Sequence, residues 1–138
     1  MFTKGARMSP DETKAVLHTY VGATNAREPI DWYFGPGYRY HGPMGDMDRD
    51  AFVQQHDRFL AAFPDVNMSI QDIVVEGDKA ATRWSARGTH QGQLMGIPPT
   101  GRVVTMTGIV VTRFADGKAV EETEEIDMFG LMRQLGVA

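Results

Sequence analysis

The spacing of apolar residues changes at about residue 64, and this change restricts the fold more than any other feature of the sequence. Before it, apolar residues recur at helical spacing over about 10–26 and 49–63. After it come four strand candidates, three of them rich in β-branched residues, at 66–75, 80–90, 103–114 and 118–126. Helices followed by strands predict an α+β domain in which the helices cover one face of a strongly curved sheet.

Local signals mark the ends of the predicted helices. Ser9 and Glu12 fit a capping box at the start of the first helix. Asp48 is a suitable N-cap for the second helix. Between the two helices, residues 30–34 predict a single helical turn and residues 38–41 predict a short strand.

Two tight turns join neighbouring strand candidates. They lie at 76–79 and 115–118, where Gly and Asp tolerate the positive φ that hairpins require. The four strands are therefore expected to form a mostly antiparallel meander. The linker 91–101 is its irregular stretch, and functional sites tend to be built on such loops at the end of a sheet.

Charge and composition exclude several classes of function. The 14 Lys and Arg residues stand against 18 acids, so the basic patch that nucleic-acid binding needs is not expected. The absence of cysteine excludes disulfides, thiol nucleophiles and thiolate metal sites. At 138 residues we expect one domain, 1–138, with residues 1–8 as a frayed leader. Neither a signal peptide nor a membrane-spanning run is evident, so we expect a cytoplasmic protein without a membrane partner.

His90 and Asp127 are the candidate catalytic residues. His90 ends a strand on the same side as Trp84 and Ala86, the apolar side that we expect to face the interior. A neutral imidazole there can orient a carboxylate or donate to an oxyanion, and the alternative is a histidine that only hydrogen-bonds the adjoining loop. Asp127 precedes the helical run 128–135, so it can serve either as an N-cap or as a general base in a pocket.

Strand alternation in the acidic segment before Asp127 predicts which acids face inward. Thr123, Glu125 and Asp127 share one face, and Glu122 and Glu124 share the other. We expect the face with Asp127 to line the interior. Glu125 then either shares the proton of Asp127 or raises the pKa of Asp127, and a solvated strand face is the alternative for Glu125 as it is for Glu121 and Glu122.

Several further side chains are candidates for substrate binding. Aromatic rings can flank a flat substrate, and methionines form an adaptable apolar wall, although ordinary core packing is the alternative for both. The candidates are Trp32, Tyr40, His41, Trp84, Met95, Met106 and Glu125. His56 lies on an apolar helical stripe, where a hydrogen-bonded core histidine is expected. The spacing of the histidines and Asp127 does not match a preformed metal site, so we expect no metal.

Three motifs stand out in the second half of the chain: GTHQGQLMGIPPTG at 88–101, RFADGK at 113–118 and DMFGLMRQLG at 127–136. Together they resemble those of the SnoaL-like polyketide cyclases, within the NTF2-like superfamily. The resemblance implies a cone-shaped α+β barrel that forms a homodimer or higher oligomer. It also implies a cofactor-free intramolecular aldol closure of a hydrophobic, carbonyl-bearing small molecule, with Asp127 as general acid/base and His90 in the same pocket.

The chain departs from this resemblance in one segment. Thr123, Glu124 and Glu125 are polar where bulkier apolar residues would line a polyketide pocket. A hydroxylation-type or dehydration activity on the same scaffold is therefore an alternative. Another is a non-catalytic module that binds a small ligand or forms a dimeric interaction, because a fold alone does not fix function.

Overall fold

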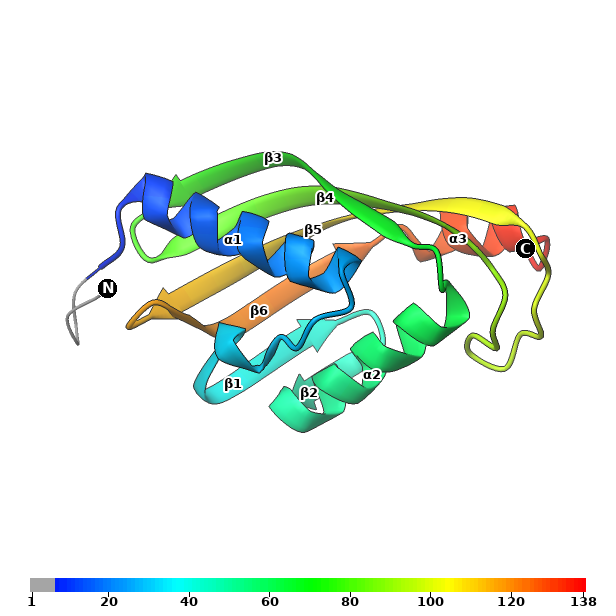
Figure 1. The fold of residues 1–138 in the computed structure, drawn as a ribbon, viewed down its shortest axis with the longest axis horizontal. Coiled ribbons are helices and arrows are strands. Elements are labelled where there is room, and N and C mark those ends of the chain that lie inside the picture. Colours follow the sequence, from blue (N-terminus) through cyan, green and yellow to red (C-terminus); the bar gives the residue numbers. More distant parts are fainter. Residues whose placement is uncertain (1–6) are drawn as a thin grey trace.

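The predicted helices and strands are present in the predicted order, with one further short strand between them (Figure 1). The computed structural model describes residues 7–138. Its helices are α1 (Pro10–Asn25), the short 3₁₀ turn η1 (Asp31–Tyr33), α2 (Arg49–Ala62) and α3 (Met128–Leu135). Its strands are β1 (Phe34–Gly42), β2 (Gly45–Asp48), β3 (Asn67–Glu76), β4 (Lys79–Thr89), β5 (Val103–Ala115) and β6 (Lys118–Ile126).

The strands form one six-stranded sheet in the order β2-β1-β6-β5-β4-β3. The predicted antiparallel meander from β3 to β6 is confirmed. The sequence did not predict β2, nor the parallel pairing of β1 with β6. This pairing brings the aromatic residues of β1 beside the acidic residues of β6.

The predicted helix caps are present. The backbone N–H of Glu12 donates to Ser9 Oγ at 3.1 Å, and the N–H of Ser9 donates to Glu12 Oε1 at 2.8 Å. Asp48 Oδ1 accepts from the N–H of Ala51 at 2.9 Å. Each cap satisfies amide groups that the first turn of a helix would otherwise leave unpaired.

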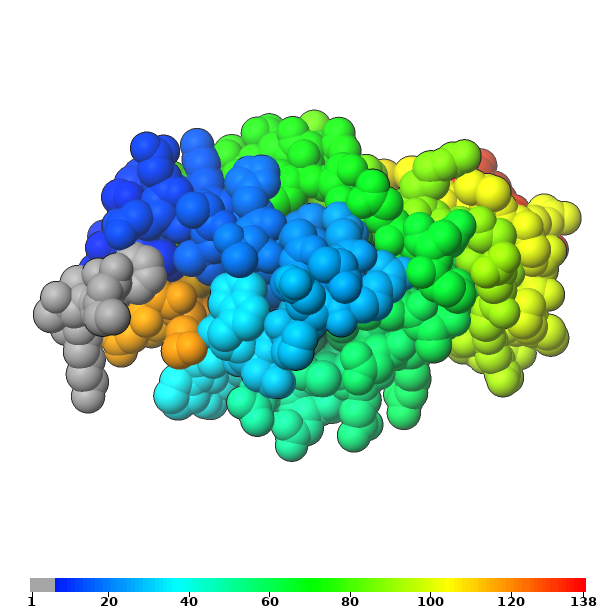
Figure 2. All heavy atoms as spheres, viewed as in Figure 1, coloured from blue at the N-terminus to red at the C-terminus, as the bar shows by residue number. Residues whose placement is uncertain are grey.

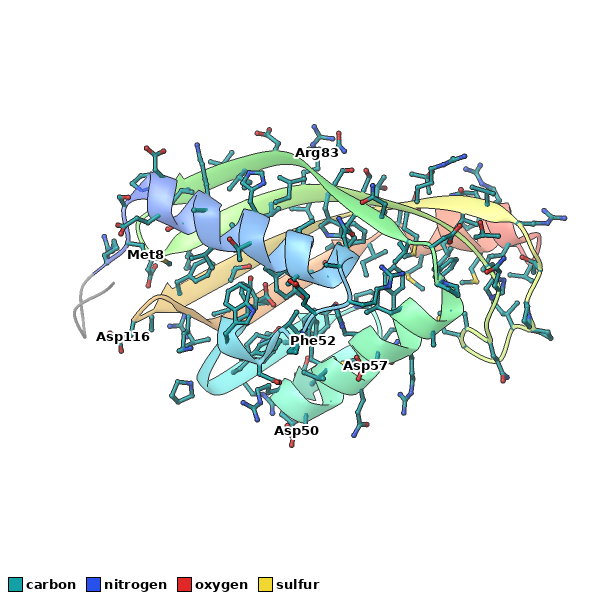
Figure 3. The ribbon with its side chains drawn as sticks, viewed as in Figure 1. Met8, Asp50, Phe52, Asp57, Arg83 and Asp116 are labelled. Carbon is teal, nitrogen blue, oxygen red and sulfur yellow. The ribbon has the colours of Figure 1, made fainter. Side chains whose placement is uncertain are left out.

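The helices α1 and α2 cover one face of the curved sheet and leave the other face open. α1 packs against β3, and α2 packs against β1 and β2. With the segment between them, they form a layer over the strands (Figure 2). Phe52 of α2 lies on the inner side of this helix, whereas Asp50 points away from it and Arg83 projects from the far side of the sheet (Figure 3). The expected α+β class, with helices on a strongly curved, mostly antiparallel sheet, is confirmed.

The end of the expected leader belongs to the core. We had expected Met8 to belong to a frayed leader. It is instead buried and packs in the same cluster as Leu17 and Tyr33. Residues 1–6 lie outside the described part of the chain. None of the helices in residues 7–138 is both long and apolar enough to cross a bilayer.

Candidate functional site

The helices and the inner face of the sheet enclose a cavity of about 190 Å³. Its walls are mainly aromatic and aliphatic, which is typical of sites for hydrophobic small molecules. Apart from tyrosine and tryptophan, the polar residues that line it are Gln55, His56, Thr82, Glu122 and Glu124. The half-exposed Met44 and Met95 also belong to its lining, which places the mouth between the β1–β2 hairpin and the loop 90–102.

A bulge in β6 turns two glutamates into this cavity. Ala119 pairs with Phe114, but the next partner of β5 is Glu121, so β6 carries one extra residue at this point. The extra residue reverses which of the following side chains face the interior and which face outward. Glu122 and Glu124 then face inward, as their lining of the cavity shows.

The prediction of which acids face inward is therefore wrong. Thr123, Glu125 and Asp127 lie on the exposed side of the chain and do not line the cavity. The apolar Ile126 is partly buried and lines the cavity instead, and it faces the same side of the strand as Glu124 because the two are two residues apart. Burying the two glutamates is tolerated because both carboxylates are hydrogen-bonded.

Glu124 is held by two donors from different strands. The hydroxyl of Tyr40 donates to Oε1 at 2.7 Å, and the indole N–H of Trp84 donates to Oε2 at 2.9 Å. Burial raises the pKa of Glu124 to about 7, and the nearby charge of Glu122 acts in the same direction. The two donors lower the pKa and so limit this rise.

Two glycines allow these donors to reach Glu124. A Cβ at Gly108 would lie 2.6 Å from Cζ2 of Trp84, so the indole can lie across β5 only because no side chain stands there. A Cβ at Gly42 would collide with the ring of Tyr40 in the same way. The hydrogen bonds to Glu124 thus depend on the absence of two side chains.

Glu122 lies deeper and is held by three hydroxyl groups. Thr112 and Tyr33 donate to Oε2 at 2.7 and 3.1 Å, and Tyr38 donates to Oε1 at 2.6 Å. Burial raises the pKa of Glu122, and the three donors oppose this effect. Burial also raises the pKa of Tyr33 and Tyr38, so both tyrosines remain protonated donors at neutral pH.

Asp127 caps α3 and is not part of the cavity lining. Its Oδ1 accepts from the N–H of Gly130 at 2.8 Å, and its side of the chain is exposed. A Cβ at Gly130 would collide with the carboxylate of Asp127, so this glycine gives the cap its space. Of the two roles that the sequence left open, the cap is the one that the structure shows.

His90 is fully buried, as its strand position predicted, but it lies under the loop 91–101. Its Nδ1 accepts from the N–H of Thr100 at 3.2 Å, and its ring packs on Phe63 at a centroid distance of 5.6 Å. It does not line the cavity. The expectation that His90 and Asp127 share one chamber is therefore wrong.

The expected substrate-binding residues divide into two groups. Tyr40, Trp84, Met95 and Met106 line the cavity, whereas Trp32, His41 and Glu125 do not. Trp32 packs edge-on against Tyr33 at 5.9 Å between ring centroids. His41 lies on the outer surface, where each ring nitrogen is 3.0 Å from a carboxylate oxygen, one of Asp46 and one of Glu121.

His56 lines the cavity, although the sequence predicted only a hydrogen-bonded core residue. Its Nε2 lies 3.1 Å from Thr24 Oγ1, while its buried Nδ1 has no hydrogen-bond partner within residues 7–138. Burial lowers the pKa of His56, which favours the neutral ring. Across the described chain, no group of three or more His, Asp or Glu side chains is placed to hold a metal ion.

A comparison with known proteins gives a family and two curated relatives. The model of the family described as "SnoaL-like polyketide cyclase" matches residues 14–135. Aklanonic acid methyl ester cyclase DnrD of Streptomyces peucetius is 30% identical over 106 residues, which cover 75% of this chain and 72% of that protein. Aklanonic acid methyl ester cyclase DauD of Streptomyces sp. strain C5 is 29% identical over 136 residues, covering 94% and 83%.

Solved structures share the same fold over nearly the whole chain. AclR of Streptomyces galilaeus, a proposed hydroxylase, matches with a TM-score of 0.87 and 32% identity, covering 94% of this chain and 88% of that one. IdmH of Streptomyces antibioticus, a proposed polyketide cyclase, matches with a TM-score of 0.80 and 32% identity, covering 91% and 99%.

Proposed function

Because the chain belongs to the SnoaL-like polyketide cyclase family, we propose that it is a cofactor-independent acid/base enzyme that closes a ring in a hydrophobic, carbonyl-bearing small molecule. One observation carries the proposal. The carboxyl group of Glu124 lies in an apolar cavity, and its pKa of about 7 is well suited to both taking up and releasing a proton near neutral pH.

The proposed reaction is an intramolecular aldol condensation. The carboxylate of Glu124 removes a proton from a carbon next to a carbonyl group, and the electron pair of that C–H bond forms an enolate. The enolate carbon attacks a second carbonyl carbon of the same molecule, so a carbon–carbon bond forms and the second carbonyl becomes an alkoxide. The protonated Glu124 then returns the proton to this alkoxide. The product is therefore an isomer of the substrate.

The surroundings of Glu124 support this role better than those of the other acids. Glu122 already accepts hydrogen bonds from three hydroxyl groups, and these occupy most of the lone pairs of its carboxylate. Asp127 is engaged as a helix cap outside the cavity. Glu124 has one donor on each oxygen, so a lone pair on each oxygen is free to accept a proton from a substrate.

The wall of the cavity supplies the rest of the environment. Rings such as Phe52, Phe59 and Trp84 can hold a flat molecule and keep water from the enolate. The methionines Met44 and Met95 at the mouth can adapt to substrates of different shape.

Turnover of aklanonic acid methyl ester, the compound in the names of the two curated relatives, tests the proposal. We expect wild-type protein to give a product of unchanged mass. Glu124→Gln should lower kcat by roughly a hundredfold or more, since general acid–base catalysis contributes about 10²–10⁴-fold. Asp127→Asn is the matched control, because the amide can still cap α3. Loss of turnover in Asp127→Asn with normal turnover in Glu124→Gln would instead support the role that the sequence suggested for Asp127.

The mass of the product separates the cyclase from the second candidate activity. The similarity to AclR, a proposed hydroxylase, is the observation that favours this alternative. A hydroxylation adds one oxygen atom to the substrate, whereas a ring closure leaves the mass unchanged. Binding of the ester without any product would indicate a non-catalytic ligand-binding module.

The proposal includes the setting in which the protein works. We propose a homodimer or higher homo-oligomer in the cytoplasm, without a metal or an organic cofactor. An open sheet face with exposed aliphatic side chains supports self-association, and Val74, Ile109 and Val111 are among its members.

A further inference from the structure

Thr82 presents a buried hydroxyl group without a protein partner. Its side chain lines the cavity and is 3% exposed. Within residues 7–138, no hydrogen-bond partner lies within reach of its Oγ1. A buried hydroxyl that lacks a partner costs free energy, and valine would fill the same volume without that cost. The hydroxyl therefore suggests a partner that is not part of the protein.

The pairing of the strands places Thr82 in line with Glu124. Ile73 of β3 pairs with Thr82 of β4, Thr82 pairs with Val110 of β5, and Val110 pairs with Glu124 of β6. Thr82, Val110 and Glu124 all line the cavity. Since neighbouring strands lie about 4.8 Å apart, the Cα atoms of Thr82 and Glu124 are separated by roughly 10 Å.

The next inward-facing pair of residues on β4 and β5 forms a wall beside Thr82, Val110 and Glu124. Trp84 and Gly108 pair with each other, and the indole of Trp84 lies over Gly108 on its way to Glu124. A flat molecule that rests on Val110 can therefore pack against this ring. One of its ends would meet Glu124 and the other would meet Thr82.

We propose that the hydroxyl of Thr82, two strands away from Glu124, binds a carbonyl oxygen at the end of the substrate opposite the carbon on which Glu124 acts. The ligand class is a flat, conjugated ketone whose carbonyl oxygen lies at the end that meets Thr82. Thr82 would select such molecules and fix their orientation, because a hydroxyl donor discriminates strongly against analogues that lack the oxygen. This inference rests on the proposed function, since it places the ligand in the same cavity.

A pair of probes of nearly the same shape tests the inference without any turnover. The probes are 2-acetylnaphthalene and 2-isopropylnaphthalene, in which a methyl group replaces the carbonyl oxygen. Their affinities are measured by fluorescence titration at pH 8.5, where Glu124, with a pKa of about 7, is mostly ionised and cannot donate to the ketone.

Three variants accompany the wild-type protein. Thr82→Val removes the hydroxyl, and Thr82→Ser keeps it. Thr13→Val removes a hydroxyl that is equally buried but lies in α1 and does not line the cavity. We expect Thr82→Val to bind the ketone roughly tenfold more weakly and the hydrocarbon as well as the wild type does. Thr82→Ser and Thr13→Val should keep the preference for the ketone.

The thermal stability of Thr82→Val gives a second readout. Without a ligand, its Tm should equal or exceed that of the wild type, because the variant loses an unpaired hydroxyl and no hydrogen bond. A lower Tm, together with weaker binding of both probes, would show that Thr82 acts only in packing and would overturn the inference. Equal binding of the ketone by Thr82→Val and wild type would also overturn it. If wild-type protein binds neither probe, the inference is overturned, whereas the proposed function fails only if turnover of aklanonic acid methyl ester is also absent.

Discussion

At Glu124, burial and hydrogen bonding act in opposite directions on one proton. Burial raises the pKa to about 7, while Tyr40 and Trp84 stabilise the ionised form. The acid/base property of this residue thus depends on side chains from β1 and β4 that are far from it in the sequence. This is why the local acidic pattern of β6 did not reveal it.

Replacing Tyr40 by Phe should shift the pH dependence of the reaction. The change removes a donor to Glu124 Oε1, so the pKa of Glu124 should rise above about 7. Because the base acts in its ionised form, the acidic limb of the kcat/KM profile should move to higher pH, with a fall of roughly two- to tenfold at pH 7. An unchanged limb in Tyr40→Phe would argue against Glu124 as the base. Trp84→Phe should shift the limb in the same direction.

Asp127 should behave as a structural residue. Asp127→Ala is expected to lower the free energy of unfolding by about 1 kcal/mol, since it removes the N-cap of α3. Asp127→Asn should stay close to the wild type in stability. Urea denaturation of the two variants measures the difference, and equal destabilisation by both would contradict the cap.

At the scale of the elements, most of the fold could be predicted from the sequence. Which face of β6 is turned toward the interior could not. Local periodicity and caps predict helices and strands well, because both depend on residues close together in the chain. The bulge in β6 arises from its pairing with β5, and one extra residue moves Glu122 and Glu124 to the opposite face. The apolar Ile126, two residues after Glu124, was the signal in the sequence that favoured the correct inward face.

The hairpin of β1 and β2 should respond to pH through His41. When protonated, His41 can donate to Asp46 of β2 and to Glu121 of β6 at once, and these bonds raise its pKa. Its contribution to stability is therefore complete below the pKa of an unfolded histidine and is lost as pH rises through the raised pKa.

Hydrogen exchange of the β2 amides measures this effect. After correction for the intrinsic effect of pH, exchange should become faster as pH rises from about 6 to 9, because neutral histidine can donate only one hydrogen bond. His41→Phe should remove the dependence. The hairpin also carries Met44 and Met47 of the cavity lining, so the same pH range should change ligand affinity. A pH dependence that persists in His41→Phe would contradict the role of His41.

For the whole molecule, the open face of the sheet carries charges that complement one another. Ile109 of β5 lies between Arg83 of β4 and Glu125 of β6, and Arg87 and Glu121 extend these basic and acidic rows. A two-fold axis along β5 would place the acidic row of one copy over the basic row of the other. The exposed aliphatic side chains would then be buried between the copies.

Light scattering of Ile109→Lys tests this arrangement. The wild type should have at least twice the mass of the 15.3 kDa chain, and the variant should approach the mass of a single chain. Because position 109 lies near the proposed axis, the lysines of the two copies would repel each other where the aliphatic side chains now meet. Val137→Lys, at another exposed aliphatic residue, should leave the mass unchanged. A wild-type monomer would contradict the proposed homo-oligomer.

The contact between Trp84 and Gly108 has a consequence for related sequences. Any side chain at position 108 would occupy the space of the indole, so a relative with a larger residue there must carry a smaller or differently oriented one at 84. The two positions are thus expected to vary together across homologues. In a relative in which both positions have changed, the acid at 124 lacks the indole donor. The pH range in which that relative is active should then differ from the range of this protein.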